Sequence, residues 1–323
     1  MNAHNNNMRK NALICLAGAV VILSLACGRK SASQTETPRN IDLAALRAAS
    51  EFRGEIVFQS DMDGNNEIYV LTSDRLRKLT DASWSSEFPK WSPDGKRIAF
   101  SANPGGRYQI FVMNADGSDV RQVTRAEHDA IEQAWFPDGK RIAFTEQRRT
   151  GLDRSYTLWS IDLETQMLER LIPEFSDSSG LPEFSPAAPL LAFTGKKLLG
   201  WDVFVYDLKS KTITQVTRGG NACRPHFSPD GRKITFVSSQ ADGKGDIWIM
   251  NPDGSGQDRL TDLPDTFDYY PSWSADGRTI VFASGTEHYP YQGQWSLSLV
   301  DVASKKIKPL FSSGAHDVFP DWH

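Results

Sequence analysis

The hydrophobic positions of this chain fall into short runs separated by polar turns, from residue 53 to the C-terminus. One run in each repeat ends in an aromatic residue, and successive copies lie 43 to 49 residues apart. These aromatic residues are Trp91, Trp135, Phe184, Phe227, Trp273 and Trp322. A period in the forties with several short strands per repeat is typical of a β-propeller. The pattern therefore predicts one repeat architecture over residues 53–323.

Four strands are expected in each repeat. The first ends at the repeated aromatic residue and enters a Ser-Pro-Asp-Gly type of turn, where Pro presets φ and Gly accepts a positive φ. Two apolar strands and a short outer strand follow, as in residues 98–100, 110–113 and 122–124. Short runs of this kind, punctuated by Gly, Asp and Asn, indicate strands and not helices. The predicted fold class is an all-β, six-bladed β-propeller of four-stranded blades.

The first repeat begins without an inner strand. The matching segment stands at the other end of the chain, at residues 319–322. We expect this C-terminal strand to pair with the N-terminal blade, because that pairing closes the ring and removes two exposed sheet edges.

The connections between strands fall on two faces of such a ring. The Ser-Pro-Asp-Gly turns are short and uniform, so their face is expected to be structural. The opposite face, called here the long-loop face, carries the variable connections at residues 145–156, 173–180, 262–270 and 283–295. Binding residues concentrate on loops held by a rigid scaffold, so we expect the binding site on this face.

A partner-binding site is predicted around the channel mouth on the long-loop face. Tyr, Trp and Arg side chains often dominate interface energies. The candidates are Glu87, Glu132, Arg224, Tyr269, Tyr270, Tyr289, Tyr291, Trp295 and Asp317. The aromatic group of Tyr289, Tyr291 and Trp295 could recognise a protein or a sugar. It could equally pack its own loop onto the ring.

The N-terminal segment has the pattern of an export signal. Arg9 and Lys10 precede an apolar run over residues 12–26, with no acidic residue, and the run is short for a transmembrane helix. The Ser-Leu-Ala-Cys-Gly sequence that follows resembles a bacterial lipoprotein cleavage site, with Cys27 as the acylated residue and an outer-membrane sorting signal after it. We therefore predict a lipoprotein-type signal peptide at 1–26 and a lipid-anchored tether at 27–52. An ordinary secretory peptide or an uncleaved anchor is the alternative.

The net charge and the number of cysteines limit the classes of function that we expect of this chain. The formal net charge is −4 at pH 7, and the sequence does not predict the clustered basic surface that nucleic-acid binding requires. Three cysteines in a chain of this length do not indicate a disulfide framework. Cys223, just before an inner strand, is expected to be a small packed thiol.

The repeat text resembles the propeller repeats of TolB, the periplasmic component of the Tol–Pal system. The resemblance is carried by SDMDGNNEIYVL, WSPDGKRIAF and MNADGSDVRQVT and spans residues 53–323. TolB also carries an α/β domain before its propeller, whereas only the tether is expected here. The resemblance implies a periplasmic platform that binds another protein or a cell-wall-linked ligand. We expect this chain to be an outer-membrane lipoprotein scaffold that binds a periplasmic or outer-membrane protein, with no chemistry, cofactor or metal of its own.

An enzyme or a solute-binding lipoprotein is the alternative function. Related propellers cap prolyl oligopeptidases, but the Gly-x-Ser-x-Gly motif of their catalytic domain does not occur here. Oligogalacturonate lyases use a related propeller with a His-bound metal, and a metal site would need several histidines to converge with carboxylates. The histidines in question are His128, His226, His288, His316 and His323. A carbohydrate- or peptide-directed lyase or hydrolase therefore stays open.

The acidic segment at residues 61–67 also has two interpretations. Its alternating Asp and Asn residues around a Gly resemble the start of a calcium-binding loop, but the downstream Glu spacing of that loop is missing. We therefore expect a connection between two strands that is stabilised by Asp, Asn and Gly.

Overall fold

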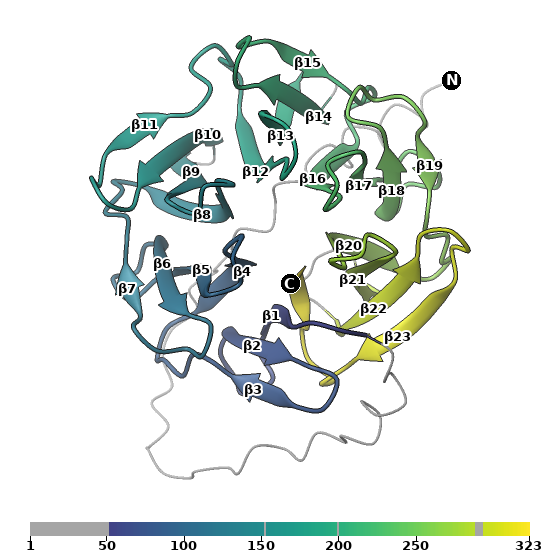
Figure 1. The fold of residues 1–323 in the computed structure, drawn as a ribbon, viewed down its shortest axis with the longest axis horizontal. Coiled ribbons are helices and arrows are strands. Elements are labelled where there is room, and N and C mark those ends of the chain that lie inside the picture. The colour runs from purple at the N-terminus through teal and green to yellow at the C-terminus, as the bar shows by residue number, and fades with distance from the viewer. Residues whose placement is uncertain (1–51, 152, 199, 288–292) are drawn as a thin grey trace.

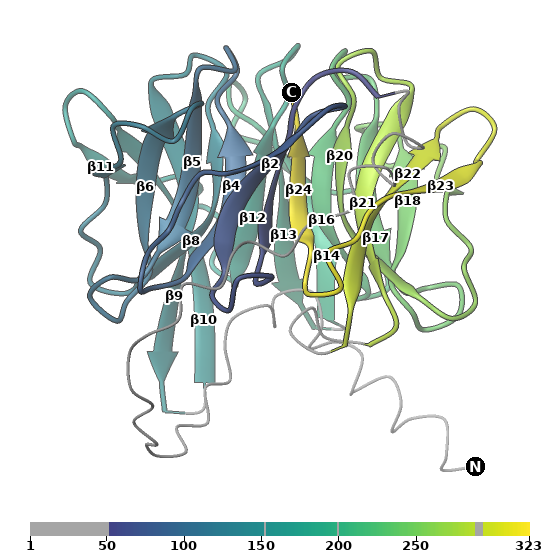
Figure 2. The same ribbon diagram turned by 90° about the horizontal axis from the view of Figure 1, so that it is seen from below.

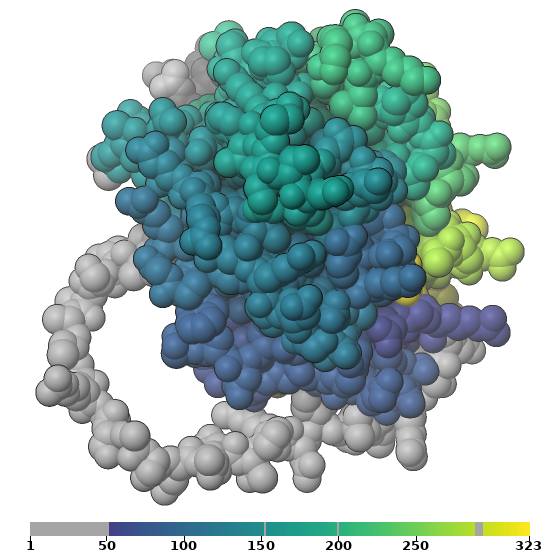
Figure 3. All heavy atoms as spheres, turned by 60° about the vertical axis from the view of Figure 1, so that its left-hand side comes forward, coloured from purple at the N-terminus to yellow at the C-terminus, as the bar shows by residue number. Residues whose placement is uncertain are grey.

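The computed structural model describes residues 52–151, 153–198, 200–287 and 293–323. Six four-stranded antiparallel sheets surround a central channel (Figure 1). The predicted six-bladed β-propeller is therefore confirmed. Seen from the side of the second to fourth blades, neighbouring blades meet in one packed wall (Figure 3). In the described part of the chain, no helix is long and apolar enough to cross a membrane.

The strands of each blade are given from the channel outward. Blade one contains β24 (Val318–Trp322), β1 (Ile56–Ser60), β2 (Glu67–Leu71) and β3 (Leu76–Lys78). Blade two contains β4 (Ser86–Trp91), β5 (Arg97–Ala102), β6 (Gln109–Asn114) and β7 (Arg121–Gln122). Blade three contains β8 (Asp129–Trp135), β9 (Arg141–Thr150), β10 (Asp153–Asp162) and β11 (Leu168–Arg170). Blade four contains β12 (Ser179–Phe184), β13 (Leu190–Lys197), β14 (Gly200–Asp207) and β15 (Ile213–Gln215). Blade five contains β16 (Ala222–Phe227), β17 (Ile234–Ser238), β18 (Asp246–Met250) and β19 (Asp258–Arg259). Blade six contains β20 (Phe267–Trp273), β21 (Thr279–Gly285), β22 (Trp295–Asp301) and β23 (Ile307–Phe311).

The ring closes through its two chain ends, as the sequence predicts. β24 pairs antiparallel with β1, with Ile56 opposite Trp322. Just beyond the strand, the backbones of Glu55 and His323 exchange two hydrogen bonds of 2.8 and 2.9 Å. The first blade is thus built from both ends of the propeller.

A phenylalanine in the second strand of every blade forms the core of the ring. All six are at most 2% exposed: Phe58, Phe100, Phe144, Phe193, Phe236 and Phe282. Burying an aromatic side chain of this size stabilises the fold by about 2–3 kcal/mol before entropic costs are counted. The second-strand phenylalanine is therefore a core position in every blade.

The turns that follow the inner strands are held by their own side chains. In blade two, the Ser92 hydroxyl donates to Asp94 Oδ1 at 2.6 Å and accepts the Arg97 N–H at 2.9 Å. Gly95 takes a φ of 66° in the same turn, a value that glycine adopts without a steric penalty. Ser228 and Ser274 repeat these contacts in blades five and six. Blades two, five and six therefore share one side-chain-bonded turn type on this face.

In four blades the outer strand ends earlier than the sequence pattern suggests. The threonine predicted to end each of these strands accepts a backbone N–H of the third strand with its hydroxyl, and these threonines are Thr80, Thr124, Thr217 and Thr261. Thr124 Oγ1 accepts the Ile110 N–H at 2.8 Å, and Thr217 Oγ1 accepts the Val203 N–H at 2.8 Å. The side chain thus replaces a ladder bond, and the regular strand stops before it.

The long connection expected at residues 145–156 is instead a strand hairpin. β9 and β10 stay paired from Ile142 opposite Ile161 out to Thr150 opposite Asp153. Figure 2 shows this hairpin extending past the rest of the ring on the long-loop face. The expectation of an irregular loop there is wrong, because the alternating side chains of these residues continue the sheet.

Candidate functional site

Each inner strand contains one residue in the left-handed region of φ, between 54° and 59°. These six residues, called here the channel ring, are Phe88, Glu132, Leu181, Arg224, Tyr270 and Phe319. The pairing register shifts at this point, and proline follows five of the six residues. Proline has no N–H to donate, so the strand bulges here. All six members of the channel ring consequently line one pocket inside the channel.

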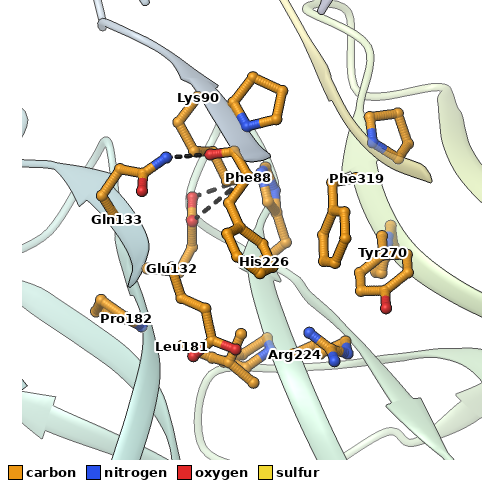
Figure 4. A pocket seen from close by; sticks show the side chains of 15 residues that line it. Phe88, Lys90, Glu132, Gln133, Leu181, Pro182, Arg224, His226, Tyr270 and Phe319 are labelled. Atoms are coloured by element: carbon orange, nitrogen blue, oxygen red, sulfur yellow. Dashed lines mark hydrogen bonds and ion pairs between the residues drawn. The ribbon is translucent and has the colours of Figure 1, made fainter. Parts of the chain in front are cut away.

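Aromatic and aliphatic side chains form most of the pocket wall. The ring of Phe319 lies 4.5 Å from the ring of Phe88 and 3.9 Å from the ring of Tyr270, centroid to centroid. Leu181 lines the same pocket near Glu132 and Arg224 (Figure 4). The cavity has a volume of about 80 Å³.

Two ionisable side chains of the channel ring interrupt this apolar wall. Arg224 is 7% exposed, and its guanidinium carbon lies 4.4 Å from the centroid of the Tyr270 ring. Glu132 is 6% exposed. Among the described residues, Arg224 Nε and Nη1 and Glu132 Oε2 are buried without a hydrogen-bond partner. The pocket thus contains a cationic and an acidic group with spare bonding capacity.

Burial controls the ionisation of Glu132. It raises the pKa of the carboxyl to about 7, although Arg224, the Thr145 hydroxyl and the backbone at Leu181 act in the opposite direction. Glu132 therefore changes charge near neutral pH, whereas a guanidinium stays charged at any physiological pH.

A cluster of ionic side chains closes the pocket toward the Ser-Pro-Asp-Gly face. We call this group the ionic cluster: Lys90, Glu183, His226 and Asp321. Lys90 Nζ lies 2.9 Å from Asp321 Oδ1 and 3.7 Å from Glu183 Oε2. His226 Nε2 lies 3.5 Å from a carboxylate oxygen of each acid. Burial alone would raise the pKa of Asp321, but Lys90 and His226 outweigh it and lower that pKa to about 2. The ionic cluster therefore holds four inner strands together.

Three of the nine predicted site residues meet in this pocket: Glu132, Arg224 and Tyr270. Tyr289 and Tyr291 lie outside the described residues. The other four are buried in the framework around the channel: Glu87, Tyr269, Trp295 and Asp317. Their part in partner binding stays a prediction.

Glu87 and Asp317 are occupied by internal hydrogen bonds. Glu87 accepts bonds from Asn66 Nδ2 at 2.8 Å and from the Tyr108 hydroxyl at 2.5 Å. Asp317 accepts bonds from the Ser60 hydroxyl at 2.7 Å and from the Ser313 N–H at 2.6 Å. Both carboxylates thus tie a connection on the long-loop face to a neighbouring strand.

Trp295 does not stand on an exposed arm; it packs onto the ring, which is the second of the two roles that the sequence left open. It is fully buried and pairs with Gly285 across β21 and β22. A Cβ on Gly285 would lie 2.5 Å from the Trp295 indole, so the missing side chain makes room for the ring. Tyr269 packs beside the indole at 5.8 Å.

Sequence reasoning missed Phe88, Leu181, Phe319 and the ionic cluster. A signal was available, because proline follows the channel-ring residue at the same place in five inner strands. Cys223, one residue before Arg224, is fully buried as expected. It is disulfide-bonded, so the expectation of a free thiol there is wrong.

The described histidines do not converge on one site. His226 belongs to the ionic cluster, and His316 Nδ1 lies 2.6 Å from Asp61 Oδ2. In the described ranges, no three His, Cys, Asp or Glu side chains are arranged to hold a metal ion. In the acidic segment at residues 61–67, Asp63 accepts the Tyr69 hydroxyl at 2.7 Å and Glu67 accepts the Ala82 N–H at 2.8 Å. These carboxylates therefore hold a connection between strands.

Comparison with known proteins gives relatives of several kinds. An uncharacterized protein of Agrobacterium fabrum is 26% identical over 77% of this chain and 84% of its own length. Dipeptidyl-peptidase 5 of Porphyromonas endodontalis is 26% identical over 57% of this chain and 34% of its own length. The Tol-Pal system protein TolB of Anaeromyxobacter dehalogenans is 31% identical over 56% of this chain and 41% of its own length. The chain thus spans less than half the length of the peptidase and of the Tol-Pal protein.

A solved structure and a family model agree on the fold. The crystal structure of TolB from Acinetobacter baumannii superposes with a TM-score of 0.71 at 20% identity, over 83% of this chain and 66% of the other. The family model of the TolB beta propeller domain matches residues 49–169 and 153–323. The predicted resemblance to TolB repeats is confirmed, and the chain belongs to the TolB beta propeller family.

Proposed function

We propose that this protein is a non-catalytic scaffold of the bacterial cell envelope whose propeller binds a protein partner at the channel mouth on the long-loop face. The observation that carries the proposal is the channel pocket. Its volume of about 80 Å³ is well below the roughly 300–1,000 Å³ of sites that enclose a whole small molecule. It has room for a single inserted side chain, and side chains anchored in such pockets dominate many protein interfaces.

The proposed location follows from family membership and from the N-terminal sequence. The TolB relative is named as a Tol-Pal system protein, which supports an envelope role for this chain. Residues 1–26 read as an export signal, and Cys27 follows it in a lipoprotein-type context. We therefore place the propeller in the periplasm, held at the outer membrane by a lipid on Cys27.

Site-specific photocrosslinking in cells tests this proposal. A photoreactive amino acid replaces exposed Arg148 at the tip of the β9–β10 hairpin, and in a control it replaces exposed Lys96 in a turn on the opposite face. One discrete protein adduct from the Arg148 position, absent from the Lys96 position, is the expected result. Equal adducts from both positions, or none from Arg148, would count against a partner at the long-loop face.

A peptide- or carbohydrate-directed enzyme is the second candidate. The observation that favours it is Glu132, whose pKa of about 7 suits a general acid or base and whose neighbour is a buried arginine. The peptidase relative points the same way, although the match covers only a third of that protein. Turnover of a peptide or oligosaccharide mixture by the purified chain, abolished in Glu132→Gln, would favour this candidate over the scaffold.

A further inference from the structure

We infer that the polar part of the channel pocket binds a carboxylate of the partner, and that Glu132 takes up a proton when this carboxylate enters. The inference rests on the proposed function, because it names the chemistry of the group that the partner inserts.

The two ionisable side chains of the channel ring differ in how they tolerate burial. Glu132 can avoid the cost of a buried charge by binding a proton, and its pKa of about 7 shows that it does so in part at neutral pH. Arg224 cannot lose its charge, because a guanidinium stays protonated in proteins. A buried charge without a counterion is strongly unfavourable. An anion that compensates Arg224 therefore suits this pocket.

The geometry around Arg224 leaves space for that anion. One face of its guanidinium stacks on Tyr270 at 4.4 Å, and Nε and Nη1 have no partner among the described residues. Its backbone N–H is already used, since it donates to Thr194 Oγ1 at 3.0 Å. The free guanidinium nitrogens are the donors that recognise carboxylates with charge-assisted hydrogen bonds.

Protonated Glu132 fits the same anion. A neutral carboxyl group has an O–H to donate, and Oε2 of Glu132 has no partner among the described residues. An ionised Glu132 would instead repel an incoming carboxylate. Entry of the anion therefore favours the protonated form, and the complex holds one proton more than the free protein above pH 7.

The other titratable groups near Glu132 do not account for this proton. Tyr270 on β20 and Tyr156 on β10 interact with it, and burial raises the pKa of both hydroxyls well above neutral. Arg224 on β16 stays charged. Three members of the ionic cluster, Lys90, Glu183 and His226, line the other end of the pocket, and Asp321 lies behind them, 2.9 Å from Lys90 Nζ. Histidine is the residue type whose charge can change near neutral pH, so the test must separate His226 from Glu132.

The apolar wall of the pocket indicates which kind of group lies next to the carboxylate of the partner. Phe88, Phe319 and Leu181 line the pocket beside Arg224, so an aromatic or aliphatic group next to the acid matches the site. Two sources in a polypeptide supply this combination, namely a C-terminal carboxylate on an apolar residue and an acidic side chain beside one.

Calorimetric titration of the full chain with small probes tests the inference. N-acetyl-L-phenylalanine represents a C-terminal carboxylate, and N-acetyl-phenylalanyl-aspartyl amide represents an acidic side chain. N-acetyl-L-phenylalaninamide lacks the charge, and phenethylamine reverses it. We expect at least one acid to bind, the amide to bind at least about tenfold more weakly, and the affinity of the acid to fall about tenfold per pH unit above pH 7.

Three variants identify the residues responsible. Arg224→Gln should lose acid binding, whereas Arg218→Gln, at an exposed position on the same face, should retain it. Glu132→Gln imitates the protonated acid, so it should bind the acid equally at pH 6 and pH 8. A pH dependence that persists in Glu132→Gln would assign the proton to another group, such as His226, and overturn the inference. Melting temperatures within the range of the parent protein establish that each variant is folded.

The outcomes also separate this inference from the proposed function. Equal binding of acid and amide, preference for phenethylamine, or no saturable binding of either acid would overturn the carboxylate assignment. If the Arg148 crosslink is still obtained, the scaffold proposal stands without it. If an acid binds but no crosslink forms, the pocket recognises carboxylates and the protein-partner proposal fails.

Discussion

The Lys90 ammonium on β4 lies 2.9 Å from the Asp321 carboxylate on β24, and this ion pair joins the second blade to the strand that completes the first. The same carboxylate accepts the Trp91 N–H at 2.8 Å. Asp321 thus bonds both the side chain and the backbone of the neighbouring inner strand. Because the Asp321 side chain is 9% exposed, water screens this pair only weakly.

Removing the charge of Asp321 should destabilise the ring. Asp321→Asn keeps the shape but leaves the Lys90 ammonium, on a side chain that is 25% exposed, with only the longer contact to Glu183. We therefore expect a loss of about 2 kcal/mol in the free energy of unfolding. Urea denaturation measures it. Asp258→Asn is the control, because it breaks the exposed 2.7 Å pair with Lys305 and should cost less than about 1 kcal/mol. Similar losses in both variants would contradict the role given to Asp321.

Low pH should remove the stabilisation that the Asp321 carboxylate provides. The pKa of Asp321 is about 2 in the folded protein and has an ordinary value of 3.8. A carboxylate with a lowered folded-state pKa stabilises the protein fully above its unfolded pKa, and this stabilisation disappears as pH falls through the folded value. The stability difference between the parent protein and Asp321→Asn should therefore shrink between pH 4 and pH 2. Parallel curves over that window would disprove this linkage.

Glu132 should have the opposite pH dependence. Its pKa rises from 4.5 to about 7 on folding, so the folded state holds the extra proton between these values and stability declines as pH rises through them. Glu132→Gln removes the titrating group. Between pH 4.5 and pH 8, the free energy of unfolding of the variant should rise relative to that of the parent protein by on the order of 3 kcal/mol. Urea denaturation at both pH values checks this, and a constant difference would show that Glu132 is not the group responsible.

Two glycines in equivalent turns should differ in their tolerance of alanine. Gly95 and Gly139 both have a φ of 66°, so each substitution carries a similar backbone cost of about 1–2 kcal/mol. A Cβ on Gly95 would also lie 2.0 Å from His323 Nε2, whereas a Cβ on Gly139 meets nothing closer than 3.7 Å. Gly95→Ala should therefore lower the free energy of unfolding by about 1 kcal/mol more than Gly139→Ala does. Adding His323→Ala should remove that excess, and a double-mutant cycle in urea detects it.

Trp295 should act as a packing residue. Its side chain is fully buried, so Trp295→Ala leaves a large cavity and should cost about 4 kcal/mol in the free energy of unfolding. Trp84, which is 40% exposed, is the matched control, and its alanine variant should change stability by less than about 1 kcal/mol. Thermal and urea unfolding distinguish the two. A small loss at position 295 would show that the indole is not held in the core.

The fold could be predicted from the sequence because every blade repeats the same constraint. The second-strand phenylalanine recurs in all six blades and the glycine turn in four of them, so each copy supports the assignment of the others. Even the C-terminal strand that closes the ring was visible as the inner strand absent from the first repeat. The exact ends of the outer strands could not be predicted in the same way. The Thr124 hydroxyl accepts the Ile110 N–H, and the sequence pattern does not show where a side chain competes with the backbone for such a bond.

The site could be predicted only in part, because side-chain direction depends on the bulges. Arg224 and Tyr270 face the channel since each sits at a left-handed residue before proline. Tyr269, one residue earlier, points into the framework against Gly245 and Trp295. Adjacent tyrosines look equivalent in a list of aromatic residues. Only the backbone geometry separates a pocket residue from a packing residue.

The pairing of β24 with β1 also has a consequence for how the chain folds. This contact joins residues about as far apart in sequence as the propeller allows, with Ile56 opposite Trp322. High contact order slows folding, because loop-closure entropy is lost before the contact is gained. The first blade cannot be completed until the last strand has been synthesised. Synthesis and ring closure thus follow a fixed order, in which the ring closes after β24 is available.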